Sequence, residues 1–249
     1  MACTGSGIVA ILILFVAVVL NSISFILPLW STSDVVNEAY SKEVTKADFA
    51  AGLWGYCTDL AITKQSNTNA SLAFDHCYFF HSNNDVDLSE FKEVNKDWNF
   101  AEGSICNGYS TASGLGEVAR LAYTKGLAYL AGMDSTQFDL FLKRSCSAVG
   151  TATLFFASLA SIAGTLAFIG TVLGVTCCKN QSRFNVATKV LISFAMVSTV
   201  LTFALWIYQA HPLNKADDVS LSGSFILNVL SAVLFLISGG LLARHSTVS

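Results

Sequence analysis

The stretch Gly52-Leu53-Trp54-Gly55-Tyr56-Cys57 lies in the loop that follows the first long apolar run of the chain. That run ends at Trp30, and a second cysteine, Cys77, follows the stretch. A single tryptophan at a membrane edge carries little information, but glycine, tryptophan and cysteine combined in this loop are more specific. They predict a small extracellular β-sheet seated on a bundle of membrane helices.

The charges of the chain are unevenly distributed, although 12% of its residues are charged and 53% are apolar. Four stretches contain no Asp, Glu, Lys or Arg: 8–30, 147–178, 190–211 and 219–243. A helix needs about 20 residues to cross a hydrocarbon core and satisfies its own backbone hydrogen bonds there. We therefore expect a mainly α-helical membrane protein, with a four-transmembrane-helix bundle and a small β-sheet.

The expected organisation is a single membrane domain, 1–249, with both long and short loops. Its membrane spans are expected at 8–29, 147–176, 187–209 and 221–243. The first extracellular loop covers 30–146 with an inserted helical region at 81–145, and the second covers 210–220. A cytoplasmic loop, 177–186, and a cytoplasmic tail, 244–249, complete the chain.

The first apolar run has an alternative interpretation as a cleaved signal peptide. Ser22 and Ser24 are small residues placed like a cleavage site. We favour a retained helix, because no basic residue precedes the run and apolar residues continue to Trp30.

Orientation follows from the short loops, since long loops are translocated largely regardless of their charge. Lys179 and Arg183 lie between the second and third runs, Lys189 lies at the edge of the third, and Arg244 follows the fourth. These charges predict a multi-pass membrane protein with both termini in the cytoplasm. The expected location of the protein is the plasma membrane, with cell–cell junctions as a candidate site within it.

Cysteine usage agrees with this orientation. The expected outer loop contains an even number of cysteines, Cys57, Cys77, Cys106 and Cys146. An even number in an oxidising compartment predicts two disulfides, whose connectivity these residues leave open. Asn69-Ala70-Ser71 is a glycosylation sequon in the same loop, whereas Asn180-Gln181-Ser182 lies on the cytoplasmic side and is expected to stay unmodified.

The outer loop also carries secondary-structure signals. Short strands are expected at 29–32, 53–59 and 77–80, with a turn at 63–71. Helices are expected at 87–94 and 114–133. A further helix, capped by Asp134 or Ser135, is expected to run straight into the second membrane span.

The residues quoted first, together with Arg144 just before the second apolar run, resemble the claudin superfamily. This superfamily also includes peripheral myelin proteins, epithelial membrane proteins and calcium-channel gamma subunits. The motif residues are Trp30, Gly52, Leu53, Trp54, Cys57, Cys77 and Arg144. The resemblance implies a claudin-like bundle and a Cys57–Cys77 disulfide. The remaining two cysteines of the loop, Cys106 and Cys146, are expected to form a second disulfide, which departs from the claudin pattern. Trp30 and Trp54 suit the membrane interface as amphipathic anchors.

Three features depart from the claudin pattern. Nineteen residues separate Cys57 from Cys77, more than in claudins, and the outer loop contains a long insertion. The chain ends on a polar residue, Ser249, which suits the groove of a PDZ scaffold poorly. Binding to PDZ scaffolds is therefore not expected, and barrier formation by polymerised strands does not follow from the motif.

Two features lie near the cytoplasmic end of the second span. Cys177 and Cys178 are candidates for palmitoylation, with unmodified cysteines as the alternative. Gly170-x-x-x-Gly174 predicts close helix packing. We favour packing within the bundle, and lateral oligomerisation is the alternative.

The sequence favours no enzymatic activity. It shows no nucleotide-binding loop, catalytic triad or metal-ligand set, so no cofactor and no nucleic-acid partner are expected. His76 and His81 flank Cys77, but a metal site is disfavoured because Cys77 is expected in a disulfide. The segment 31–146 has fifteen acidic and nine basic residues, a net charge of −6, which raises the local cation concentration. A solvated surface is the simpler interpretation of that charge.

The resulting hypothesis is an interaction protein that acts in cell–cell contact, adhesion or junction assembly. Its expected partners are membrane lipids and other membrane proteins in the same or the facing membrane, including further copies of itself. The alternative hypothesis is a gamma-type accessory subunit that regulates the gating or trafficking of a channel or receptor.

Replacing Asn69 by Gln is expected to remove a glycan, because the outer loop would pass through the secretory pathway. Electrophoretic mobility with and without glycosidase treatment measures this change. Asn180→Gln is the matched control and should leave the mobility shift intact. A shift that disappears in Asn180→Gln instead would contradict the predicted topology.

Overall fold

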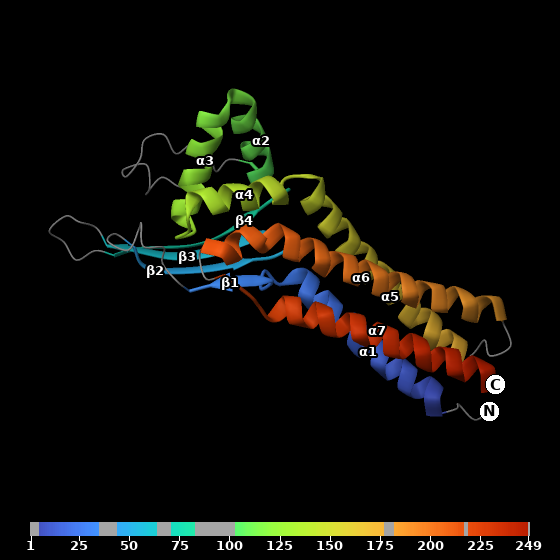
Figure 1. Cartoon of the computed structure of the whole chain (residues 1–249). Coiled ribbons are helices and arrows are strands. Elements are labelled where there is room, and N and C mark those ends of the chain that lie inside the picture. Colours follow the sequence, from blue (N-terminus) through green and yellow to red (C-terminus); the bar gives the residue numbers. More distant parts are fainter. Residues whose placement is uncertain are drawn as a thin grey trace. The chain divides into compact units, whose positions relative to one another are not determined.

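The computed structural model of the chain describes residues 5–34, 44–63, 71–82, 103–176, 182–216 and 219–248. Within these residues the chain forms seven helices and five strands (Figure 1). The helices are α1 Gly5–Ile26, α2 Ile105–Leu115, α3 Glu117–Leu130, α4 Ser135–Ser145, α5 Ala148–Thr176, α6 Ser182–Ala216 and α7 Gly223–Val248. The strands are β1 Ser31–Ser33, β2 Val44–Ala51, β3 Gly55–Thr63, β4 Ser71–Phe79 and β5 Ser220–Leu221.

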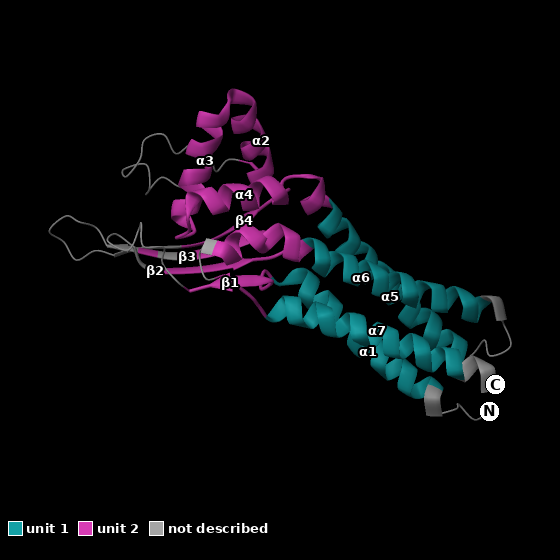
Figure 2. Cartoon of the chain, in the orientation of Figure 1, with its two compact units in different colours: residues 1–27, 152–205, 223–249 teal, residues 28–151, 206–222 magenta. Residues whose placement is uncertain are grey.

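The chain divides into two compact units (Figure 2). The bundle unit comprises 1–27, 152–205 and 223–249, and the sheet unit comprises 28–151 and 206–222. The sequence predicts a single domain, 1–249. The sheet unit has a buried core of its own, which includes Tyr56, Phe138 and Trp206, and this core accounts for the division.

Four helices are long and apolar enough to cross a membrane: α1, α5, α6 and α7. The protein is therefore a multi-pass membrane protein. Together with the antiparallel five-stranded sheet, these helices confirm the expected fold class, a claudin-like four-helix bundle with a small β-sheet.

The third membrane helix is longer than expected. Helix α6 continues to Ala216, through most of the segment 210–220 that we expected to be a loop. It does so despite Pro212, a residue that removes a backbone hydrogen bond and usually ends or kinks a helix. Ala210 and Leu213 on either side of Pro212 are fully buried, and this packing offsets the lost hydrogen bond.

Polar side chains join three helices inside the bundle unit. Asn228 of α7 donates a hydrogen bond to Asn21 of α1 over 3.4 Å, and Asn21 donates to Ser161 of α5 over 2.9 Å. Both asparagines are buried. Such bonds help to hold membrane helices together, where the hydrophobic effect between helices is absent.

Small residues allow the bundle helices to approach closely. A Cβ atom at Gly170 of α5 would lie 2.7 Å from the hydroxyl of Thr188 of α6, and one at Gly174 would lie 3.0 Å from Asn185. The Gly170/Gly174 pair therefore lies against α6 of the same chain. This is the packing within the bundle that we favoured over lateral oligomerisation.

The sheet has the strand order β4-β3-β2-β1-β5, and all neighbouring strands are antiparallel. Strands occur at three expected places, in β1, β3 and β4. Strand β2 was not expected, because Lys, Ala and Asp in its sequence VTKADFAA are poor strand formers. Strand β5 has only two residues, too few for a sequence signal.

Of two helix predictions in the inserted region, one is confirmed and one is wrong. The expected helix 114–133 is present as α3, but it begins only after Gly116, whose φ of 120° is accessible mainly to glycine and separates α3 from α2. The expected continuous helix from Asp134 into the second span ends at Ser145, because Cys146 is tied to Cys106 and the Ser147 hydroxyl accepts from the backbone N–H of Val149. Asp134 does cap α4, as expected, by accepting from Thr136 and Gln137. The expected helix 87–94 and residues 64–70 of the expected turn lie outside the described residues.

The substitution Gly170→Leu is expected to destabilise the bundle unit, because the new side chain would overlap the buried Thr188. Overpacking of this kind costs about 1–3 kcal/mol, so the unfolding temperature in detergent should fall by several degrees. Gly240→Ala is the matched control, since a Cβ there meets nothing within 4 Å. If Gly170→Leu left the unfolding temperature unchanged but abolished an oligomer, the packing of Gly170 against α6 of the same chain would be contradicted.

Candidate functional site

Trp30 belongs to the core of the sheet unit. Its side chain is fully buried, and its ring lies 5.6 Å from the ring of Trp206 of α6. The backbone N–H of Trp30 donates to the carbonyl of Ala51, and the carbonyl of Trp30 accepts from the N–H of Ser222. These two hydrogen bonds connect Trp30 to the end of β2 and to the residue that follows β5. The expected role of Trp30 as an amphipathic anchor at the membrane interface is therefore wrong, because packing against Trp206 buries its ring.

The Gly-Leu-Trp-Gly element forms the tight turn between β2 and β3. Gly52 donates its backbone N–H to the carbonyl of Gly55 over 2.8 Å. A Cβ atom at Gly55 would lie 2.0 Å from the carbonyl oxygen of Tyr78, so only glycine allows β4 to approach this closely. Leu53 is buried, whereas Trp54 is 39% exposed and remains available as an interface anchor.

Both expected disulfides are present. Cys57 and Cys77 are direct partners in the β3–β4 register, and their Cα atoms are 3.9 Å apart. Cys106 and Cys146 connect the start of α2 to the end of α4. The first bridge therefore fixes the strand pairing, and the second fixes the inserted helices.

The inner face of the sheet is covered by α4. The ring of Phe138 stands edge-on to Tyr56 with their centroids 5.3 Å apart, and Phe141 stands edge-on to Phe80 at 5.9 Å. All four side chains are buried. Burial raises the pKa of Tyr56 well above its usual value, so its hydroxyl stays neutral.

Arg144, the basic residue of the motif, lies at the end of α4. Its guanidinium donates to the backbone carbonyl of Tyr208 in α6 and lies over the tyrosine ring, 4.3 Å from its centroid. A cation above an aromatic face is stabilised by the ring quadrupole. Arg144 therefore joins α4 to the part of α6 that belongs to the sheet unit.

A polar cluster that the sequence did not predict holds the inserted helices together. Asp139 of α4 is buried and accepts hydrogen bonds from Arg120 and, at 3.0 Å, from Thr124 of α3. Tyr109 of α2 donates to the same carboxylate over 3.2 Å. The signal in the sequence was a single acid, Asp139, between Phe138 and Phe141, on the buried face of α4.

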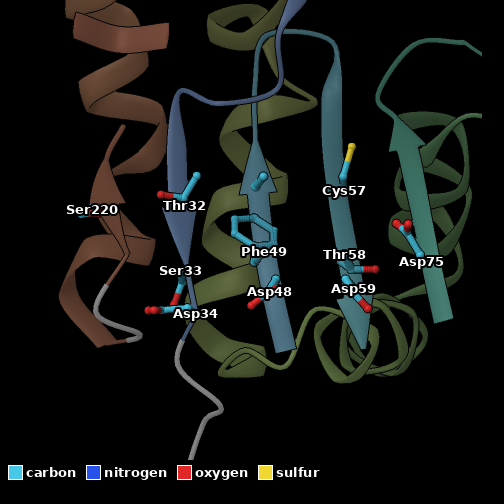
Figure 3. A pocket seen from close by; sticks show the side chains of 11 residues that line it. Thr32, Ser33, Asp34, Asp48, Phe49, Cys57, Thr58, Asp59, Asp75 and Ser220 are labelled. Carbon is cyan, nitrogen blue, oxygen red and sulfur yellow. The ribbon is translucent and has the colours of Figure 1, made fainter. Parts of the chain in front are cut away.

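The outer face of the sheet carries a row of aspartates, the acid row. Asp48 of β2 pairs with Asp59 of β3, and Asp59 pairs with Asp75 of β4. Asp34 directly follows Ser33, whose partner is Phe49, and so lies beside Asp48 (Figure 3). Because side chains alternate between faces, these four side chains lie opposite the buried Phe49 and Tyr56.

The acid row lines a hollow of about 510 Å³ on the sheet (Figure 3). The other lining residues include Thr32, Cys57 and Ser220, and none of the described lining residues is basic. The acid row brings four aspartates together on one face of the sheet, which makes it the best candidate for a surface that serves an interaction.

The geometry does not favour a metal site. Within the described residues, no three His, Cys, Asp or Glu side chains are placed to hold a metal ion. His76 stands edge-on to Tyr78, with centroids 5.0 Å apart, and Cys77 is in a disulfide. Burial lowers the pKa of both His76 and His81.

Three predicted modification sites lie outside the described residues. They are the sequon residue Asn69 and the palmitoylation candidates Cys177 and Cys178.

Cys57→Ser and Cys77→Ser are each expected to cause retention in the secretory pathway. Loss of a bridge that closes a loop of this size costs about 3 kcal/mol, a large share of the stability of a domain. Surface biotinylation measures delivery, with Cys177→Ser as the control that should reach the surface normally. Normal delivery of both bridge variants would refute the structural role of this disulfide.

Comparison with known proteins gives no assignment. No known family model matches the chain, and no curated protein matches its sequence. Membership of the claudin superfamily therefore stays a prediction that rests on the motif and agrees with the fold class.

Proposed function

We propose that the chain is a claudin-like membrane protein that acts in cell–cell contact or junction assembly through the outer face of its sheet. The observation that carries this proposal is the acid row, which extends in register over adjacent strands. The row includes Asp48, Asp59 and Asp75. A partner with a basic surface would meet several carboxylates of this sheet at once.

An extracellular position of the sheet unit is part of the proposal. Its two disulfides support this position, because disulfides persist in oxidising compartments. Lys189 and Arg244 support it too, since they occur near the N-terminus of α6 and the C-terminus of α7, and basic residues favour the cytoplasmic side.

The chemistry of the acid row selects the kind of partner. Two acid rows repel each other, so the complementary surface is a basic patch, either on another membrane protein or elsewhere on a second copy. Complementary charges accelerate encounter and suppress wrong partners. Because the disulfides and the aromatic inner face hold the sheet rigid, little conformational entropy is lost on binding.

The accessory-subunit hypothesis is the second candidate, and a different feature favours it. Leu115 and Val118 lie at the α2–α3 turn and are 78% and 84% exposed. This apolar tip belongs to the insertion that departs from the claudin pattern. Exposed apolar side chains of this kind fit a specific protein partner in the same membrane.

Expression in isolated, non-adherent cells tests the proposed function. The tagged chain is expected to concentrate at cell contacts. The variant Asp48→Asn/Asp59→Asn/Asp75→Asn should lose this enrichment. An exposed charge pair contributes about 0.5 kcal/mol, so three pairs together change the affinity roughly tenfold. Fluorescence at contacts relative to free membrane measures the effect.

Glu117→Gln is the matched control, because Glu117 is an acid with a 79% exposed side chain outside the acid row. It should leave the enrichment unchanged in cells with equal surface delivery. Diffuse staining of the wild type would contradict the contact role. The accessory role would take its place if a large membrane protein co-purified with the wild type but not with Leu115→Ser/Val118→Ser.

A further inference from the structure

The Cys57–Cys77 bridge lies on the outer face of the sheet. Tyr56 and Tyr78, the neighbours of the two cysteines in β3 and β4, are buried on the inner face. Because side chains of a strand alternate between faces, Cys57 and Cys77 lie on the opposite side. Cys77 is exposed, whereas Cys57 is half-buried and lines the hollow beside Asp75 (Figure 3). One end of this bridge is therefore open to reagents from solvent.

The Cys106–Cys146 bridge provides a comparison within the same unit. Both of its cysteines are half-buried, and Ser145 beside it is fully buried. Of the four cysteines that the two bridges join, Cys77 has the greatest exposure. The rate of thiol–disulfide exchange depends on the access of the attacking thiolate to the sulfur. We therefore expect the Cys57–Cys77 bridge to react first.

The sheet order distinguishes the two sulfurs of this bridge. Strand β3, with Cys57, lies between β2 and β4, whereas β4, with Cys77, is the edge strand of the described sheet. An attacking thiolate thus reaches Cys77 more readily than Cys57. Attack on the sulfur of Cys77 makes the sulfur of Cys57 the leaving group.

The strand register makes this exchange reversible. Nine residue pairs join β3 and β4, and Cys57 is the direct partner of Cys77. On the inner face, the rings of Tyr56 and Tyr78 stack with their centroids 5.2 Å apart. A disulfide stabilises mainly by constraining the unfolded chain, so the folded sheet keeps its pairing when the bridge opens. The Cys57 thiol therefore stays beside Cys77 and can close the bridge again.

The charge beside Cys77 selects the kind of thiol. Asp75 is exposed and precedes Cys77 by two residues on β4, so the two side chains lie on the same face, about 7 Å apart along the strand. This separation is shorter than the Debye length of about 10 Å at 0.1 M salt. The carboxylate attracts a thiol that carries an ammonium group and repels one that carries a sulfonate.

We propose that Cys77 is a site of reversible S-thiolation by small cationic thiols. The thiolate of the reagent attacks Sγ of Cys77 and forms a new S–S bond, while the Cys57–Cys77 bond breaks and the Cys57 thiolate takes up a proton. In the reverse step, Cys57 attacks the mixed disulfide and releases the reagent. One disulfide replaces another, so no oxidant is consumed. The site does not depend on the function proposed for the acid row.

Brief treatment of the purified full-length chain with cysteamine, a cationic thiol, tests this inference. The folded chain in detergent is then quenched with N-ethylmaleimide, and its peptides are analysed by mass spectrometry without reduction. We expect the first product to carry cysteamine on Cys77 and maleimide on Cys57. A first adduct on Cys57, Cys106 or Cys146 would overturn the proposal. Removal of cysteamine before the quench should restore the closed bridge, and a bridge that stayed open would contradict reversibility.

The variant Asp75→Asn tests the selection by charge. The rate of reaction with cysteamine is divided by the rate with mercaptoethanesulfonate, an anionic thiol. Comparison of this ratio between the wild type and the variant cancels the intrinsic reactivity of each thiol. The ratio should fall about threefold in Asp75→Asn, the effect of one charge at this distance and about 0.1 M salt. Glu117→Gln is the matched control and should leave it unchanged. The same ratio in the wild type and in Asp75→Asn would contradict selection of a cationic thiol.

Discussion

The packing of Phe138 and Phe141 of α4 against the inner face of the sheet is the contact on which the sheet unit depends. A small sheet is stable only when one face is covered, and here α4 supplies that cover. Burying an aromatic side chain contributes roughly 2–3 kcal/mol, and its edge-on contacts add about 1 kcal/mol. The other contacts of the unit, including Trp30 against Trp206 and Arg144 over Tyr208, connect this centre to the last turns of α6.

Coverage of one face determines what the other face can do. Strand alternation directs Phe49 and Tyr56 inward, and the same alternation directs Asp48 and Asp59 outward. The packed core lies on the inner face, so the side chains of the outer face are not needed for packing and can carry the acid row.

The membrane helices and the sheet differ in how far the sequence predicts them. Length and absence of charge are enough to predict α1, α5 and α7, because the bilayer imposes a minimum span. The end of α6 was missed, since Pro212 suggests a break that tertiary packing overrides. Strand β2 was missed for a similar reason: its pairing with β1 and β3 stabilises residues that have little intrinsic preference for a strand.

The candidate site was predicted only in part. The motif residues Gly55, Cys57 and Cys77 were expected, and they shape the β3–β4 pair. The acid row was not, because it depends on strand register, which brings together aspartates from distant parts of the sequence. Trp30 shows the converse difficulty: its place at the end of an apolar run suggests an interface anchor, whereas its partner Trp206 comes from the far end of the sequence.

Carboxylate labelling in intact cells tests the central claim most directly, that the outer face of the sheet is the surface used at cell contacts. Asp34 and Asp75 are exposed on that face, and Glu117 is exposed elsewhere in the sheet unit. A water-soluble carbodiimide with an amine tag, followed by peptide mass spectrometry, compares isolated cells with cells in contact. The account predicts that contact protects Asp34 and Asp75 while Glu117 is labelled equally in both. Equal labelling of all three residues in both states would contradict it.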